Sequence, residues 1–261
     1  DDLIRHGDVE AEGCSHRQVR RGAIRQGRHP SHSEPHLLKL AEARIDAALD
    51  LWSTTGQSHN PELHLLLSRA FGLENGGLHP AGTLAVAARQ DNIISMATVF
   101  CLLGCNWPRA LEMSKRCFEQ VDQRHDKSHS PSPLLPHADR LLQRLHDAGI
   151  QLAVISNDTR SGIQSFLKHH GLSDRFSGCW SADDQPRKPN PAAVHQLCQR
   201  LNLTPERCAL IGDAETDLSM ARMAGIGCVI GYLGGWAKQP DLPSATHRLM
   251  DWDDLVTITT P

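Results

Sequence analysis

The feature that most restricts the fold of this chain is a change of hydrophobic period between its two parts. After the Ser/Pro-rich segment 128–133, short apolar runs suited to buried strands alternate with amphipathic helical stretches. Such alternation is typical of βαβ units, in which parallel strands are joined by helical crossovers. The predicted fold class is therefore α/β, with a doubly wound, Rossmann-like parallel sheet and a separate all-α domain.

In the α/β part we expect a helix first and then strands and helices in alternation. The predicted strands are 150–155, 176–180, 208–211, 228–232 and 247–250, and the predicted helices are 134–148, 160–169, 191–201, 218–224 and 252–255. Ligands of such sheets bind at the carboxyl ends of the strands. The residues that follow each strand are therefore the first place to look for a functional site.

The part that precedes the Ser/Pro-rich segment carries no strand pattern. Its apolar residues recur at intervals of three and four, which predicts the amphipathic helices 35–52, 61–72, 83–103 and 108–124. We divide the chain into an atypical N-terminal segment 1–33, a helical domain 34–128 and an α/β core domain 129–261.

Composition excludes several classes of function. The formal net charge is -3, so no basic stripe favours nucleic-acid binding. No apolar run approaches the roughly 20 residues that a membrane helix needs, and the polar N-terminus shows no secretory signal. None of the 8 cysteines forms a C-x-x-C pair, which favours free thiols in a reducing cytosol. We expect a cytoplasmic protein and leave its oligomeric state open.

Polar residues of complementary chemistry follow the predicted strands. Ser156 and Asn157 follow one strand, Asp213 and Asp217 follow another, and Lys188 lies between them in the sequence. Taken singly, each residue has a structural explanation as a helix cap, a solvated lysine or a first-turn acid. Their joint occurrence at strand ends instead favours one shared site.

The chemistry that suits this set is phosphoryl transfer. A hydroxyl and backbone N–H groups can hold phosphoryl oxygens, and a lysine stabilises the charge of the transition state. Carboxylates can hold Mg²⁺, which prefers oxygen ligands. The candidate roles are phosphate binding for Ser156, Asn157 and Lys188, catalysis for Lys188, and metal binding for Asp213 and Asp217. This set contains no nucleophile and no general acid.

The motifs resemble those of the haloacid dehalogenase superfamily of phosphatases over about 134–235. Residues 153–157 resemble the second motif of the family, Lys188-Pro189 the third, and residues 211–217 the fourth and most specific. The resemblance implies that Ser156 and Lys188 bind the phosphoryl group. It also implies that Asp213 ligates Mg²⁺ and that Asp217 supports the metal site or Lys188.

The helical domain stands where one subgroup of this family inserts a helical cap. That subgroup includes phosphoglycolate phosphatases and phosphomutases. The resemblance therefore implies that residues 34–128 form a cap that excludes water and selects the substrate. It also implies that segment 1–33 supplies the first strand of the core.

The first motif of the family is missing from this segment. It should be a hydrophobic strand followed by Asp-x-Asp-Gly-Thr, in which the first Asp is the nucleophile and the second the general acid/base. If residues 24–29 are encoded ATT CGA CAA GGA CGG CAC, a shift of one base reads Phe-Asp-Lys-Asp-Gly-Thr. We interpret the difference as a frameshift, which puts Arg25 and Gly27 in the positions of the two aspartates.

The leading functional hypothesis is a Mg²⁺-dependent phosphatase that acts on a small phosphorylated metabolite and is impaired in the chain as written. The mechanism implied by the resemblance passes through an aspartyl-phosphate. The first alternative is a phosphomutase of the same superfamily. The second is a catalytically degenerate member that binds a phosphate ligand, or that binds a partner through its cap.

Overall fold

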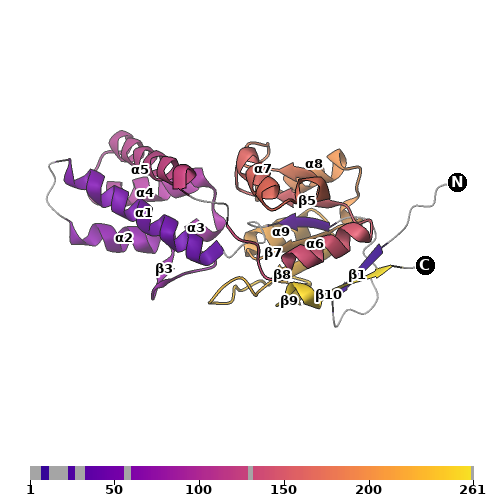
Figure 1. Cartoon of the computed structure of the whole chain (residues 1–261). Helices are drawn as coiled ribbons and strands as arrows, with labels where there is room; N and C mark the ends of the chain where they lie inside the picture. The colour runs from indigo at the N-terminus through magenta and orange to yellow at the C-terminus, as the bar shows by residue number, and fades with distance from the viewer. Residues whose placement is uncertain (1–6, 12–22, 27–32, 56–59, 129–131, 260–261) are drawn as a thin grey trace. The chain divides into compact units, whose positions relative to one another are not determined.

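The computed structural model describes residues 7–11, 23–26, 33–55, 60–128 and 132–259. Contacts divide the chain into two compact units, one made of Asp1–His32 with Ser132–Pro261 and the other of Ser33–Pro131. The first unit contains the main sheet, and the second is largely helical (Figure 1). No helix in the part of the chain that the structure describes is long and apolar enough to cross a membrane.

The helical unit packs its elements around an aromatic core. Trp52 stacks on Phe100, with ring centroids 5.7 Å apart, and Phe71 meets Phe118 edge to face. The elements are α1 (Ser33–Ser53), α2 (Pro61–Phe71), α3 (Thr83–Val86), α4 (Arg89–Leu102) and α5 (Trp107–Ser128), with a short hairpin of β3 (Leu73–Glu74) and β4 (Gly77–Leu78).

Among the predicted helix boundaries that were wrong, two have a clear physical reason. The predicted helix 83–103 is interrupted at Ala87 and Ala88, whose backbones are extended. The amide of Asn92 donates to the carbonyl oxygens of both residues at this break, which satisfies groups that a continuous helix would have paired. Helix α6 (Ala138–Asp147) begins four residues later than predicted, since Pro136 disfavours helical geometry in the residue before it.

The α/β unit contains a six-stranded sheet in the order β6-β5-β2-β7-β8-β9, in which every pairing is parallel. The strands are β2 (Ala23–Gln26), β5 (Leu152–Ile155), β6 (Phe176–Trp180), β7 (Ala209–Gly212), β8 (Cys228–Tyr232) and β9 (His247–Leu249). The predicted α/β class with a doubly wound parallel sheet is thereby confirmed.

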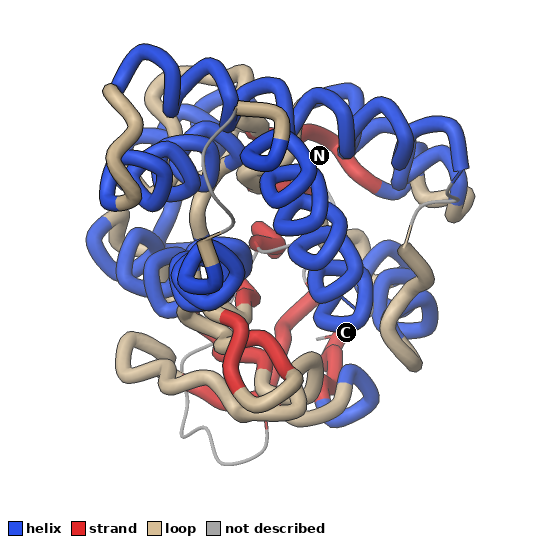
Figure 2. The backbone as a smooth tube through the Cα atoms, turned by 90° about the vertical axis from the view of Figure 1, so that its left-hand side faces the viewer, coloured by secondary structure: helices blue, strands red, loops and turns tan. Residues whose placement is uncertain are grey.

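Helices cover both faces of this sheet (Figures 1 and 2). On one face, α6 and α7 (Arg160–His169) pack on an apolar cluster that includes Leu152, Val154 and Ile211. On the other, α8 (Pro191–Arg200) and α9 (Glu215–Met223) pack on a cluster that includes Ala153 and Leu210. The 3-10 helices are η1 (Ser173–Arg175), η2 (Pro205–Arg207) and η3 (Trp252–Asp254).

Residues 23–26, at the position expected for the first motif, form a central strand. Strand β2 lies between β5 and β7, and the backbone of Arg25 pairs with Val154 on one side and Ile211 on the other. Gly27 lies outside the described residues. A second, unpredicted pairing joins β1 (Gly7–Ala11) to β10 (Leu255–Thr259) in an antiparallel ribbon.

Candidate active site

The candidate site lies at the carboxyl edge of the parallel sheet. Strand β5 leads into Ser156 and Asn157, and β7 leads into Asp213. Strand β2 lies between these two strands, so their ends are separated by about 10 Å, twice the spacing of neighbouring strands. An extended ligand over the end of β2 could therefore reach groups from both sides.

Ser156 is buried, and its hydroxyl has a defined role as an acceptor. Its side chain receives a hydrogen bond from the backbone N–H of Asp158 at 3.1 Å, and its own N–H donates to the carbonyl of Trp180. A serine hydroxyl can accept and donate at once, so its proton stays available for a ligand oxygen. Asn157 is half-buried beside it. Thr159, rather than either of them, caps α7 by accepting from the N–H of Gly162.

Lys188 forms a buried ion pair with Asp217. The Nζ atom of Lys188 lies 2.8 Å from Oδ2 of Asp217, and the two side chains are only 4% and 7% exposed. Asp217 lies in the first turn of α9, four residues beyond Asp213. The lysine is therefore not a solvated loop residue, because its ammonium group is held next to the loop that follows β7.

The loop that carries Lys188 is anchored by the buried carboxylate of Asp184. This carboxylate accepts from the N–H and hydroxyl of Ser181, from Arg160 of α7 at 2.7 Å and from Arg200 of α8 at 3.2 Å. Burial raises the pKa of Asp184, but the bonds from Ser181 and the two guanidinium groups outweigh it and hold this pKa below the ordinary value. The loop is therefore fastened to two helices on opposite faces of the sheet.

Asp213 receives a hydrogen bond that the sequence did not predict. The indole N–H of Trp236 donates to Oδ2 of Asp213 at 2.9 Å, and the tryptophan is 9% exposed. Nothing in the local sequence links the two residues, which are separated by 23 positions. The one available hint was the Gly234-Gly235 pair before Trp236, which indicates a tight turn after β8.

The described residues fit a magnesium ion through Asp213. Its carboxylate is half-buried at the end of a central strand and is of the hard oxygen type that Mg²⁺ prefers. Mg²⁺ is commonly held by one or two carboxylates and keeps several water molecules. Asp217 offers less to an ion, because its Oδ2 atom already accepts from Lys188.

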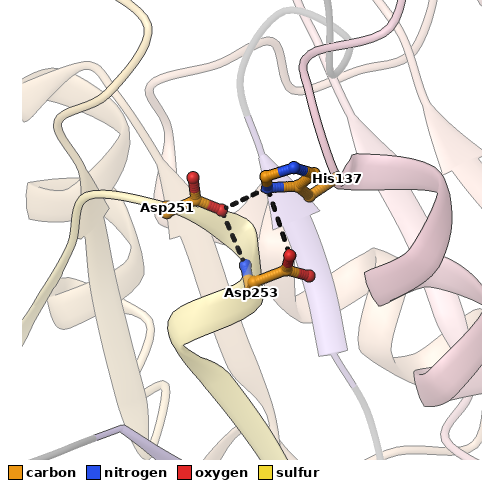
Figure 3. A group of neighbouring side chains, drawn as sticks. All are labelled: His137, Asp251 and Asp253. Atoms are coloured by element: carbon orange, nitrogen blue, oxygen red, sulfur yellow. Dashed lines mark hydrogen bonds and ion pairs between the residues drawn. The ribbon is translucent and has the colours of Figure 1, made fainter.

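A second group of potential metal ligands lies between the start of α6 and η3. Figure 3 shows the His137 ring pointing at Asp251 and Asp253, whose carboxylates come within 2.9 Å and 3.2 Å of its Nδ1 atom. Both contacts use the same ring nitrogen, so hydrogen bonding to His137 explains them without a metal. The hydrogen bonds from the backbone N–H of Asp253 and from His137 also hold the pKa of Asp251 below its usual range.

Comparisons with known proteins agree with this architecture. A family model described as haloacid dehalogenase-like hydrolase matches residues 113–225. The crystal structure of a predicted phosphoglycolate phosphatase from Haemophilus somnus 129PT is similar, with a TM-score of 0.63 and 20% identity, over 90% of this chain and 96% of that one. A 2-haloacid dehalogenase from Pseudomonas syringae pv. tomato DC3000 aligns with a TM-score of 0.54 and 18% identity, over 89% and 95% of the chains.

These findings confirm the resemblance to haloacid dehalogenase-like hydrolases in core sequence and in fold. Among curated relatives, the chain is similar to phosphoglycolate phosphatases. It is 32% identical to that of Vibrio vulnificus strain CMCP6 over 131 residues, which is 47% of this chain and 58% of the relative. It is 32% identical to that of Aliivibrio fischeri strain ATCC 700601 / ES114 over 147 residues, 53% and 65% of the two chains. The matched region thus spans less than two thirds of these relatives.

Proposed function

We propose that this protein is a Mg²⁺-dependent phosphatase for a small phosphorylated metabolite, and that the chain as written is catalytically impaired. The observation that carries the proposal is the buried Lys188–Asp217 ion pair, in which Asp217 follows Asp213 by four residues in the first turn of α9. Burying an ammonium group is costly unless it is paired. A lysine kept in such a place is suited to meet a ligand that carries high negative charge.

In this proposal Ser156, Asn157 and Lys188 bind the phosphoryl group. The hydroxyl of Ser156 can donate to a phosphoryl oxygen while it accepts from the N–H of Asp158. The ammonium group of Lys188 has further protons to donate beyond the one directed at Asp217. A fixed cation in a site of low polarity stabilises the additional charge of the transition state without reorganising.

Asp213 is the proposed ligand of Mg²⁺, and Asp217 the residue that holds Lys188 in place. When bound, Mg²⁺ would neutralise negative charge on the phosphoryl oxygens. Phosphoglycolate, the substrate in the name of the curated relatives, is the first candidate substrate. A cytoplasmic location and a role of the helical unit as a substrate-selecting cap stay predictions.

The impairment follows from the residues in the two aspartate positions of the first motif. Arg25 and Gly27 carry no carboxylate, so neither can form an aspartyl-phosphate or transfer the required proton. This observation favours one alternative, a degenerate member that binds a phosphate ligand without turnover. The phosphomutase alternative lacks an observation in its favour beyond the shared motifs.

The test compares the chain as written with a repaired chain, in which residues 22–30 are replaced by Val-Leu-Phe-Asp-Lys-Asp-Gly-Thr-Leu. We expect the repaired chain to hydrolyse phosphoglycolate in the presence of Mg²⁺ at least about 10³-fold faster, because loss of a covalent nucleophile costs at least that much. Release of inorganic phosphate, with and without EDTA, is the measurement.

The controls separate the alternatives. Equal turnover by the two chains would contradict the assignment of the first motif. Saturable phosphate binding by the chain as written, together with an inactive repaired chain, would favour the degenerate member. Activity that depends on an added sugar bisphosphate would instead favour the phosphomutase.

A further inference from the structure

We propose that Trp236 is a positioning residue for the carboxylate of Asp213. Its indole N–H donates to Oδ2 of Asp213, which fixes the orientation of the carboxylate and favours the other oxygen as the ligand of a divalent cation. The inference rests on the proposed function only in that Asp213 is taken as the metal ligand. It adds that the β8–β9 loop controls how this ligand binds.

The start of this loop is fixed by close backbone contacts. A Cβ on Gly234 would lie 2.1 Å from the carbonyl oxygen of Met250, so only glycine fits there. The preceding residue, Leu233, donates its backbone N–H to the carbonyl of Leu249 at 2.8 Å. The backbone is therefore fixed at Gly234, where it contacts the chain beyond β9, and Trp236 follows only two residues later.

The far part of the same loop is tied to the first turn of α9. The backbone N–H of Ser244 donates to Glu215 at 3.1 Å, and the hydroxyl of Ser244 donates to the other oxygen of that carboxylate. Leu242, between the two tethers, is 2% exposed in the apolar cluster under α9. The loop thus holds the segment that contains Asp213 at two places, through Trp236 and through Ser244.

The chemistry of an indole makes this contact a positioning device. The indole N–H can donate but cannot accept or bind a cation, so Trp236 cannot itself be a ligand. A hydrogen bond to a charged, partly buried carboxylate is stronger than one between neutral groups. Because one oxygen of Asp213 already accepts this hydrogen bond, the other would be favoured as a metal ligand, and Mg²⁺ is commonly held by one or two carboxylates.

The first experiment uses Mn²⁺ as a paramagnetic probe and the indole N–H resonances of the ¹⁵N-labelled protein. The chain has 5 tryptophans, and Trp236→Phe identifies the resonance of interest. We expect sub-stoichiometric Mn²⁺ to broaden this resonance first and most strongly, and Asp213→Asn to abolish the effect. The measurement is made on both the chain as written and the repaired chain. The broadening seen in the chain that binds Mn²⁺ more tightly is used to judge the inference.

The second experiment measures metal affinity. Removal of a partner that orients a metal ligand costs roughly 10–100-fold in affinity, so we expect Trp236→Phe to weaken Mn²⁺ binding about 10-fold by electron paramagnetic resonance. In the repaired chain, the Mg²⁺ concentration for half-maximal activity should rise similarly, with turnover at saturating Mg²⁺ little changed. The matched control is Trp252→Phe, since Trp252 is also buried in the same unit but stacks on Tyr232.

The outcomes separate this inference from the proposed function. Unchanged metal affinity in Trp236→Phe, or equal losses in both tryptophan variants, overturns the inference. Failure of both chains to bind Mn²⁺ also overturns it, as does broadening that spares the Trp236 resonance. If the repaired chain is inactive as a phosphatase but Mn²⁺ broadens the Trp236 resonance through Asp213, the proposed function fails and the inference stands.

Discussion

Strands β2 and β7 are neighbours in the sheet and differ in the chemistry of their side chains. They run parallel, with Ala23 paired to Ala209 and Arg25 paired to Ile211. Strand β7 is apolar and buried and ends at the acid Asp213, whereas β2 reads Ala-Ile-Arg-Gln. Parallel pairing uses main-chain groups that every residue except proline carries. A strand can therefore hold its place in the ladder whatever side chains it carries.

The surroundings of β2 remain those of an apolar strand. The partners of Arg25 in the register, Val154 and Ile211, are 5% and 3% exposed. A small apolar cavity lies beside this part of the sheet, and its lining includes Leu152 of β5 and Ile211 of β7. The environment of the β2 position thus fits the hydrophobic strand of the family better than the residues now written there.

The largest effect should come from Lys188, which pairs with Asp217 in the helix that follows β7. In the repaired chain we expect Lys188→Ala to lower phosphatase turnover by roughly 10²–10³-fold, the usual cost of one preorganised electrostatic contact. Initial rates of phosphate release at saturating substrate and Mg²⁺ measure it. Lys168→Ala, at an exposed lysine in the last turn of α7, is the control. Equal rates in the two variants would remove Lys188 from the site.

The second prediction separates the structural role of β2 from its chemical role. In the chain as written, Arg25→Val should raise the free energy of unfolding by a few kcal/mol, because valine matches the buried, apolar residues that pair with this position, Val154 and Ile211, and carries no charge to desolvate. For a chain of this size each kcal/mol shifts the melting temperature by roughly 2–4 °C. Phosphatase activity should not return, since valine supplies no carboxylate. Calorimetry measures the expected gain in stability, and the phosphate assay measures the expected absence of activity. An unchanged melting temperature would show that Arg25 costs no stability.

Hydrophobic period explains how far the sequence could predict the fold. Burial in a parallel sheet leaves apolar runs at 150–155 and 208–211, and these identified β5 and β7 and therefore the edge where Ser156 and Asp213 lie. The same signal could not find the break at Ala87, because the apolar repeat continues across it while hydrogen bonds from Asn92 end the helix.

The contacts that hold the candidate site were harder to predict. The Trp236–Asp213 bond and the anchoring of Asp184 by Arg160 join segments separated by 23 and 24 positions, and neither has a spacing rule. Such contacts depend on where loops fold back, which the period of a helix or strand does not encode. The residues of β2 carry no strand pattern of their own, so a strand in segment 1–33 was expected only from the resemblance to the family.

The smallest effect concerns the anchor of the Lys188 loop. Because the folded-state pKa of Asp184 is held below the ordinary value of 3.8, its charged form stabilises the fold above that pH. This contribution is lost as the pH falls through the lowered pKa. Asp184→Asn removes the charge that meets Arg160 and Arg200 but keeps the size of the side chain, so we expect a loss of about 1–3 kcal/mol near neutral pH.

The pH dependence gives this last prediction its sign. The difference in unfolding free energy between wild type and Asp184→Asn should be largest above about pH 5 and should shrink in more acidic solution, where Asp184 itself becomes protonated. Urea titrations at a series of pH values measure it. Asp183→Asn is the matched control, since Asp183 is the neighbouring acid and accepts from the backbone N–H of Arg160, with no guanidinium partner among the described residues. A difference that does not vary with pH would mean that the charge of Asp184 does not anchor the loop that carries Lys188. The ion pair with Asp217, in the helix that follows β7, would then be the contact that holds Lys188 in place.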